Sequence, residues 1–419
     1  MATPETLPNT TSAAVKQRLV GVDATRGIAL LGMMAVHALW SSDAEGHVTW
    51  TYDLAAGRSA ATFAVLAGVG IAFMTGRRKV VGPDRKGVAV SLATRAALIG
   101  LIGLALGYAD SDVMSVILVY YAVLFVLAIP LTFLPSWALA VTGTAIALGM
   151  PVASHLLRPG LPESSGVNPS FDYLLSHPVD LLTELTLTGV YPALPWMAYI
   201  CAGLLVGRLR LSSPRVALKL LVFGAAAAAA AAAGSWWALR SLGGRDQLYA
   251  TAGEAGITAD EVTEMLIWGT GGTTPTTTWW WLATDAPHTT TPLDLLHTTG
   301  VAVALLGALL LLAAFGARHS PALVTGLQTL GAAGGMTLTL YSAHIVFMNS
   351  PLDVFDATTG YLVQVLAALL FAHVWHRKVG RGPLETVVTE AAQGARRAVM
   401  PREHSQPREQ PEPRKRRER

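Results

Sequence analysis

The stretch Ile28–Trp40 reads IALLGMMAVHALW, an apolar run that carries His37 close to its end. The charged pair Asp23 and Arg26 comes directly before it, in VDATRG. A histidine inside an apolar run is costly in lipid unless it faces a cavity or a partner side chain. The stretch therefore predicts a membrane-spanning helix that borders an internal polar site, and it argues against a soluble domain.

The composition of the whole chain supports this interpretation. Of its 419 residues, 52% are hydrophobic and only 14% are charged, whereas soluble domains have about 25% charged residues. A deficit of this size indicates that lipid solvates much of the surface. The one cysteine, Cys201, lies in an apolar run, so neither a disulfide nor a thiolate metal site is expected. We expect an all-α, multi-pass protein of the cell membrane.

About ten runs are apolar enough to cross a bilayer, which takes roughly 20 residues per helix. They are continuous and do not alternate as the strands of a β-barrel do. The runs cover residues 22–40, 59–76, 88–108, 113–133, 136–154, 190–208, 214–239, 294–316, 324–348 and 358–376.

The runs define a transmembrane domain over residues 20–378, preceded by a leader at 1–19 and followed by a basic tail at 379–419. Because the tail is rich in Arg, Pro, Glu and Gln, we expect it to be disordered and to have no catalytic part. Longer connections are expected at residues 41–58, 155–189 and 240–293.

Basic residues gather at one side of the alternating helices. That side holds Lys16, Arg18, Arg26, Arg77, Arg78, Lys79, Arg85, Lys86, Arg208, Arg210, Arg215, Lys219, Arg318, Arg377, Lys378 and Arg381. The opposite side holds only Arg58, Arg158, Arg240 and Arg245. Because cytoplasmic loops carry the excess of basic residues, both termini are predicted to be cytosolic.

Three histidines are candidates for chemistry. His37 lies near the outer end of the first helix, and His47 follows in the outer loop GHVTWTYD. His344 lies in GGMTLTLYSAHIVFMN, a helix dense in hydrogen-bonding side chains. A neutral imidazole can act as a general base or accept an acyl group. The alternative for each histidine is a packing role with a satisfied hydrogen bond.

A second set of charged residues could bind an anionic ligand at the cytosolic side. Asp23 and Arg26 are three residues apart, so they share a helix face and can pair. The alternative is a capping and snorkelling pair that serves only the helix end. Arg95 lies about two turns into the third helix, where an unpaired charge is costly. We assign the binding of this ligand to Asp23, Arg26, Arg77, Arg78 and Arg95, and also to Arg58 from the opposite side.

Other classes of site have little support. The sequence contains no Walker loop, dinucleotide fingerprint, nucleophile elbow or HExxH motif. Metal binding by the three histidines lacks carboxylates at suitable spacing, so no metal is expected. A basic tail alone does not indicate nucleic-acid binding. The triple Trp279-Trp280-Trp281 is typical of an interfacial belt and alternatively could stack on a sugar.

Five pieces of the chain together resemble a known family. They are VDATRGIALLGMMAVHALW, HVTWTYDLAAGRSAATFAVLAGVGIAF, YPALPWMAYICAGLLVGRL, GGMTLTLYSAHIVF and RGPLE, spread in order over most of the sequence. The set resembles heparan-α-glucosaminide N-acetyltransferase and its bacterial relatives. The resemblance is weakest over residues 240–293.

This resemblance implies acyl transfer across the membrane, by an O- or N-acyltransferase. The donor would be a cytosolic acyl-CoA, for which acetyl-CoA is the first candidate, and the acceptor an extracytoplasmic sugar or glycoconjugate. His47, which precedes Trp50, matches the histidine of the characterised enzyme, whereas His37 matches the bacterial pattern. His344 matches the histidine of the family's late YxxH-like stretch. We favour His37 because it is better placed for a sheltered site.

Several alternatives stay open at this point. The acyl group could pass directly to the acceptor or through a histidine, and the acyl chain, the acceptor and the oligomeric state are open. A transporter or flippase of a small molecule or lipid-linked sugar is the main alternative. The sequence opposes it because no internal repeat and no paired Gly/Pro-broken helices are evident. A membrane scaffold without enzyme activity is a third interpretation.

Overall fold

The computed structural model describes residues 19–400. Within this range the chain is helical, with only an isolated β-bridge between Ser42 and Val48. The helices are α1 (Val20–Ala38), α2 (Trp50–Ala55), α3 (Arg58–Met74), α4 (Asp84–Leu106), α5 (Leu118–Leu131), α6 (Ser136–Leu157), α7 (Phe171–Ser176), α8 (Pro178–Thr183), α9 (Ala193–Arg208), α10 (Pro214–Trp236), α11 (Gly244–Ala252), α12 (Ala259–Trp268), α13 (Pro292–His319), α14 (Pro321–Gly334), α15 (Thr337–Met348), α16 (Ala357–Lys378) and α17 (Pro383–Val399). Short helical turns add η1 (Arg158–Gly160), η2 (Glu184–Thr188), η3 (Trp237–Ser241), η4 (Gly253–Ala255) and η5 (Trp279–Ala283).

The all-α, multi-pass architecture predicted from the sequence is confirmed. Each predicted run coincides with a helix or with a pair of consecutive helices. Six of the described helices are long and apolar enough to cross a membrane, or up to eight if each of two bent pairs forms one span. α1 and α5 fall outside this set, so the count of about ten spans and the cytosolic placement of both termini stay predictions.

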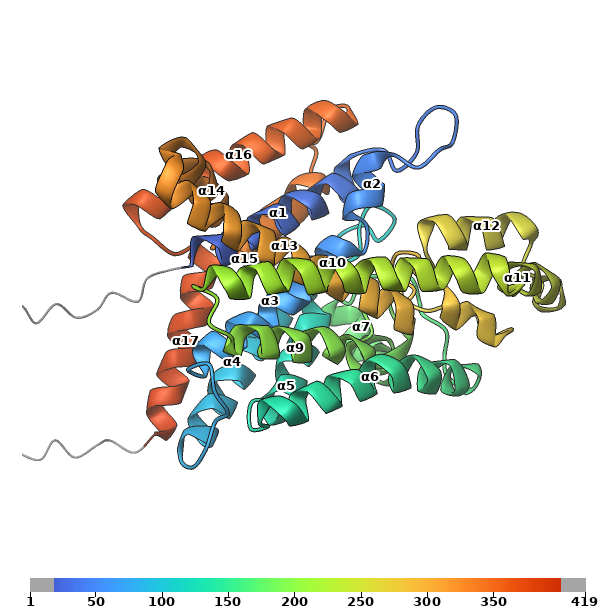
Figure 1. The fold of residues 1–419 in the computed structure, drawn as a ribbon, viewed down its shortest axis with the longest axis horizontal. Helices are drawn as coiled ribbons and strands as arrows, with labels where there is room; N and C mark the ends of the chain where they lie inside the picture. Colours follow the sequence, from blue (N-terminus) through green and yellow to red (C-terminus); the bar gives the residue numbers. More distant parts are fainter. Residues whose placement is uncertain (1–18, 401–419) are drawn as a thin grey trace, which may run out of the picture.

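The long helices lie lengthwise in one bundle (Figure 1). The described chain begins with α1 and ends with α17 at the same end of this bundle, on the left of the view. We call this the basic end, because it also holds Arg26, Arg77 and Arg381. The far end carries α2, α11 and α12.

Two pairs of helices are broken, contrary to the expectation that such pairs are absent. The chain bends by 49° between Pro178–Thr188 and Ala193–Arg208. It bends by 71° between Pro321–Gly334 and Thr337–Met348. Gly189 and Pro192 lie at the first break and Gly334 and Gly335 at the second, residues that interrupt helices because they lack a Cβ or a backbone N–H.

Small residues set the closest helix contacts. The run of Gly and Ala in α10 packs along α13, where a Cβ at Gly224 would collide with the backbone of Gly300 and Ala304. α1 meets α14 in the same way, since a Cβ at Gly334 would collide with the Asp23 carbonyl. This contact fixes the start of α15 beside the charged start of α1.

The connection at 240–293 forms a small helical cluster of its own. α11, α12 and η5 enclose the buried side chains of Leu248, Val262 and Trp281. Trp281 donates its indole N–H to Thr277 Oγ1 at 3.1 Å. Trp279, in contrast, is 53% exposed and packs beside His155. The tryptophan triple thus contributes one core residue and one residue available to lipid or ligand.

The first part of the expected disordered tail is ordered. Pro383–Val399 forms α17, which packs along α4 with Val388 and Ala392 buried. Its sequence places apolar residues at helical spacing on one face, a pattern that the charged composition of the tail obscured. The rest of the tail, residues 401–419, lies outside the described residues.

Candidate functional site

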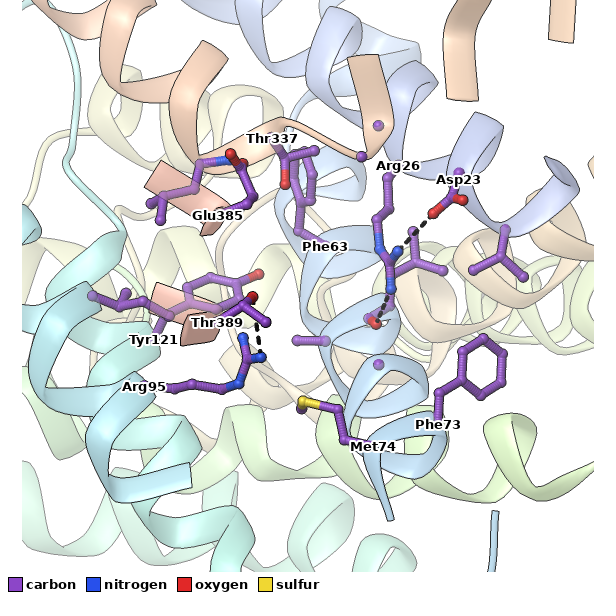
Figure 2. Close-up of a pocket in the computed structure, with 18 of the residues that line it drawn as sticks. Asp23, Arg26, Phe63, Phe73, Met74, Arg95, Tyr121, Thr337, Glu385 and Thr389 are labelled. Atoms are coloured by element: carbon purple, nitrogen blue, oxygen red, sulfur yellow. Dashed lines mark hydrogen bonds and ion pairs between the residues drawn. The ribbon is translucent and has the colours of Figure 1, made fainter. Parts of the chain in front are cut away.

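A cavity of about 850 Å³ opens at the basic end. It lies among α1, α3, α4, α5, α15 and α17, and its size is that of a ligand pocket. Its inner wall is apolar and aromatic, formed by Met33, Phe63, Ile117, Leu118, Tyr121, Phe125 and Tyr341. Its outer part is charged (Figure 2).

Four arginines and two carboxylates line the charged part: Arg26, Arg77, Arg95 and Arg381 with Asp23 and Glu385. The excess of positive charge suits a ligand that carries several negative charges. Arg26 donates to Asp23 Oδ1 at 2.9 Å, the pairing that their spacing predicted. Arg26 also donates to the Leu66 carbonyl at 3.4 Å, which ties α1 to α3.

Arg95 faces Arg26 across the cavity (Figure 2). Its terminal NH2 group donates to Thr389 Oγ1 of α17 at 3.3 Å. Its Nε is shielded from solvent and has no hydrogen-bond partner among residues 19–400. Because a buried donor without a partner is costly, this guanidinium is suited to a ligand oxygen within the cavity.

Glu385 holds the broken helix in place. Its Oε1 accepts from the backbone N–H groups of Leu338 and Thr339, at 2.7 Å and 3.1 Å, and its Oε2 accepts from the Thr339 hydroxyl at 2.7 Å. The carboxylate thus satisfies free amides in the first turn of α15 and complements the positive end of its dipole. α17 in this way fixes the helix that carries His344.

The two candidate histidines that lie in predicted spans, His37 and His344, meet at the inner end of the site. His37 Nδ1 and His344 Nε2 are 3.1 Å apart, although 307 positions separate the residues. The two rings are nearly parallel, with an interplanar angle of 8°. His344 is buried at 3% exposure, and its Nδ1 lies 2.6 Å from Oε1 of Gln364 in α16.

The hydrogen bonds indicate which ring nitrogen of His37 and of His344 carries a proton. Gln364 donates its amide N–H to the sulfur of Met348 at 3.3 Å, which turns its carbonyl oxygen toward His344. His344 Nδ1 therefore carries a proton, and its Nε2 accepts one from His37 Nδ1. The second nitrogen of His37, Nε2, is then left with a free lone pair. In this arrangement His344 orients His37, the candidate base, and Gln364 orients His344.

Replacing Gln364 with Leu is expected to lower the rate of the reaction at His37 by about 10- to 100-fold. The His344 Nδ1–H would lose its buried acceptor, which costs about 1–3 kcal/mol, and the ring could take the wrong tautomer. Gln328→Leu, at an exposed glutamine of α14, is the matched control. An unchanged rate in Gln364→Leu, measured on folded protein, would contradict the assigned hydrogen-bond chain.

The cavity and the histidine pair are continuous along two helices. Met33 lines the cavity and His37 follows four residues later on α1, while Tyr341 lines it and His344 follows three residues later on α15. Residues three or four apart share a helix face, and four residues rise about 6 Å. The imidazoles therefore lie one turn beyond the inner wall.

Three of the other predicted residues are not brought to this place. His47 is exposed in the loop after α1, where its ring lies 3.4 Å from Asp43. Arg58 begins α3 at the far end, roughly 24 Å along the helix from the cavity residue Met74. Arg78 lines a separate, smaller pocket beside α4. Arg77 does line the main cavity, and its guanidinium lies over the Phe73 ring.

Several residues of the site escaped sequence reasoning. Gln364 gave no signal, because a lone glutamine in an apolar run has no motif. Arg381 and Glu385 lie in RGPLE, a piece that contributed to the family resemblance without a role assigned to it. Thr389 was counted as part of a disordered tail. The signal that could have found Glu385 and Thr389 was the amphipathic spacing of 383–399.

The fold and site define a polytopic membrane protein with an arginine-lined cavity and a histidine pair one helical turn beyond its wall. Residues 18–239, more than half of the chain, match the family model described as heparan-alpha-glucosaminide N-acetyltransferase, catalytic. The chain belongs to this family of membrane acetyltransferases. A search of curated proteins finds no match.

Proposed function

We propose that this protein is a transmembrane acyltransferase that takes an acyl group from an acyl-CoA at the basic end and passes it to a sugar or glycoconjugate at the far end. The observation that carries the proposal is the position of His37 and His344 one turn beyond the cavity wall. The family match supports an acetyltransferase, with acetyl-CoA as the first donor to test.

The cavity has the two features that such a donor needs. CoA carries phosphates at one end and a thioester at the other. The arginines at the opening would bind the phosphates, since guanidinium groups match phosphate oxygens in geometry and charge. The apolar inner wall would take the pantetheine arm and direct the thioester toward α1 and α15.

The free lone pair of His37 can then act in one of two ways. As a nucleophile, Nε2 bonds to the acyl carbon, the carbon–sulfur bond breaks, and the thiolate leaves with the electron pair. As a base, Nε2 accepts the proton of the acceptor while the acceptor bonds to the acyl carbon, the carbon–sulfur bond breaks, and the CoA thiolate leaves with the electron pair. In both cases His344 and Gln364 stabilise the imidazolium through the hydrogen-bond chain.

The test is purified protein incubated with radiolabelled acyl-CoAs of different chain length, with and without an amino sugar. We expect label on the amino sugar, and label on the protein that hydroxylamine removes if His37 carries the acyl group. Label on the sugar but never on the protein would indicate direct transfer. Absence of transfer from every donor would overturn the proposal.

Arg95→Met is expected to raise the KM for acyl-CoA by about 10- to 100-fold with little change in kcat. The reason is the loss of a hydrogen bond to a charged group, worth about 1.5–3 kcal/mol, in a part of the donor remote from the thioester. Steady-state kinetics separate the two parameters. Arg240→Met, at an exposed arginine of the far end, is the control. A lower kcat at unchanged KM would place Arg95 in the chemical step instead.

A transporter or flippase is the second candidate, favoured by the two broken helix pairs. Discontinuous helices commonly form the substrate sites of transporters, and the break at Gly334–Gly335 lines this cavity. The discriminating measurement is solute uptake by protein-containing vesicles without an acyl donor. We expect none, and donor-independent uptake of an amino sugar would favour the transporter.

A further inference from the structure

A third histidine, His288, lies at the far end in the segment 284–291 between η5 and α13. The segment is strained, since His288 and Thr290 both have φ of 53°. Positive φ is uncommon outside glycine and a genuine outlier for the β-branched Thr290. Such strain persists only where the surroundings impose it, and it is concentrated at functional sites.

Hydrogen bonds on both sides hold this segment rigid. The carbonyl of His288 accepts from the Gly272 N–H at 2.6 Å and from the Thr270 hydroxyl at 3.4 Å. The Thr290 N–H donates to Asp294 Oδ2 at 2.8 Å. A Cβ at Gly272 would collide with the backbone of Gly189 and Val190, so the loop is wedged against the first helix break. The backbone of His288 is thereby fixed.

The imidazole of His288 is available for chemistry. Its Nδ1 is shielded from solvent and has no hydrogen-bond partner among the described residues. The ring packs edge-on against Tyr191 with the centroids 5.5 Å apart. Burial lowers the pKa of His288 to about 4, so the ring is neutral near pH 7.

His288 belongs with the histidine pair. A Cβ at Gly57, directly before α3, would come within 3.4 Å of the backbone N of His288, and a Cβ at Gly32 of α1 would collide with the Ser59 hydroxyl of α3. His288 therefore lies at the end of the bundle that holds the last turns of α1, which carry His37. The pair is reached from the cavity along α1 and α15, whereas His288 comes from a connection at the far end. A donor and an acceptor that enter from opposite ends would thus meet between these groups.

We propose that His288 is a catalytic residue of acyl transfer, the base that accepts the proton of the acceptor. The inference rests on the proposed function and adds an acceptor-side group to it. The acceptor oxygen or nitrogen bonds to the acyl carbon, and its proton goes to His288. The bond between the acyl carbon and His37 Nε2 breaks, and Nε2 keeps the electron pair. His288 is thus the base in the variant in which His37 carries the acyl group.

The test uses His288→Asn and His288→Gly in the full-length protein, because Asn and Gly tolerate positive φ. His177→Asn, at an exposed histidine of another far-end connection, is the matched control. Acetyl-CoA binding and transfer to glucosamine are measured separately. We expect His288→Asn to bind acetyl-CoA as the wild type does and to transfer about 10²-fold more slowly. Added imidazole should restore transfer in His288→Gly.

Wild-type transfer in His288→Asn would overturn the inference. So would a variant that loses acetyl-CoA binding and transfer together, or a His288→Gly protein that imidazole does not restore, because either result indicates a structural role. A wild-type protein that transfers nothing would instead overturn the proposed function. The two failures are therefore distinguishable.

Discussion

Replacement of His37 by alanine is expected to lower acyl transfer by about 10²- to 10⁴-fold, the usual contribution of a positioned acid or base. His37 has the free imidazole lone pair of the Gln364–His344–His37 hydrogen-bond chain. It lies on α1 one turn beyond the cavity residue Met33. Product formation from acetyl-CoA and glucosamine measures the loss. His319→Ala, at an exposed histidine of α13, is the control for a helical substitution.

The same assay separates His37 from the other candidates. His344→Ala should lower the rate of acyl transfer nearly as much as His37→Ala. The double variant should be only slightly slower than His37→Ala alone, because the effects of residues that act as a unit are not additive. His47→Ala should stay near the wild-type rate, since His47 is exposed and its ring pairs with Asp43. Full activity in the double variant would exclude the histidine mechanism.

Truncation after Gly382 is expected to lower acyl transfer by about 10²-fold or more. It removes Glu385, whose carboxylate fixes the first turn of α15 through three hydrogen bonds, and Thr389, which holds Arg95. Hydrogen bonds to a charged group contribute about 1.5–3 kcal/mol each. Without them the helix that carries His344 loses its anchor beside the cavity.

The matched truncation after Met400 removes only residues outside the described structure and should leave activity unchanged. Glu385→Gln provides a finer test, because the amide keeps one acceptor oxygen and loses the charge. Its acyl-transfer activity should lie between those of the two truncated proteins. Thermal unfolding of each protein separates loss of the site from loss of the fold. Equal activity in both truncations would show that α17 has no part in the site.

Much of the fold follows from the sequence because lipid imposes a simple rule on it. Each apolar run had to become a helix that satisfies its own backbone, and each did. The 71° bend between α14 and α15 was not visible in the pattern, because residues 324–348 read as one continuous apolar run. A Cβ at Gly334 would collide with the Asp23 carbonyl, and this close approach of α14 to α1 at the break is a tertiary contact that the sequence does not show.

The site was predictable where its residues lie close in sequence, or where a polar side chain within an apolar run would be energetically costly without a partner. Asp23 and Arg26 pair as their spacing indicated, and a histidine within an apolar run required a partner. The identity of that partner was not predictable, because His37 and His344 are joined by tertiary packing. Composition misled for α17, since a charged segment can still bury one narrow face.

The most direct test of the account places donor and acceptor on opposite sides of a membrane. Proteoliposomes with glucosamine trapped inside receive labelled acetyl-CoA outside, and the acetylated sugar in the lumen is measured for the wild type and for His37→Asn. We predict labelled product inside the wild-type vesicles and about 10²-fold less for His37→Asn. Equal product in both proteins, or product only when donor and acceptor share a compartment, would contradict transfer through the histidine pair.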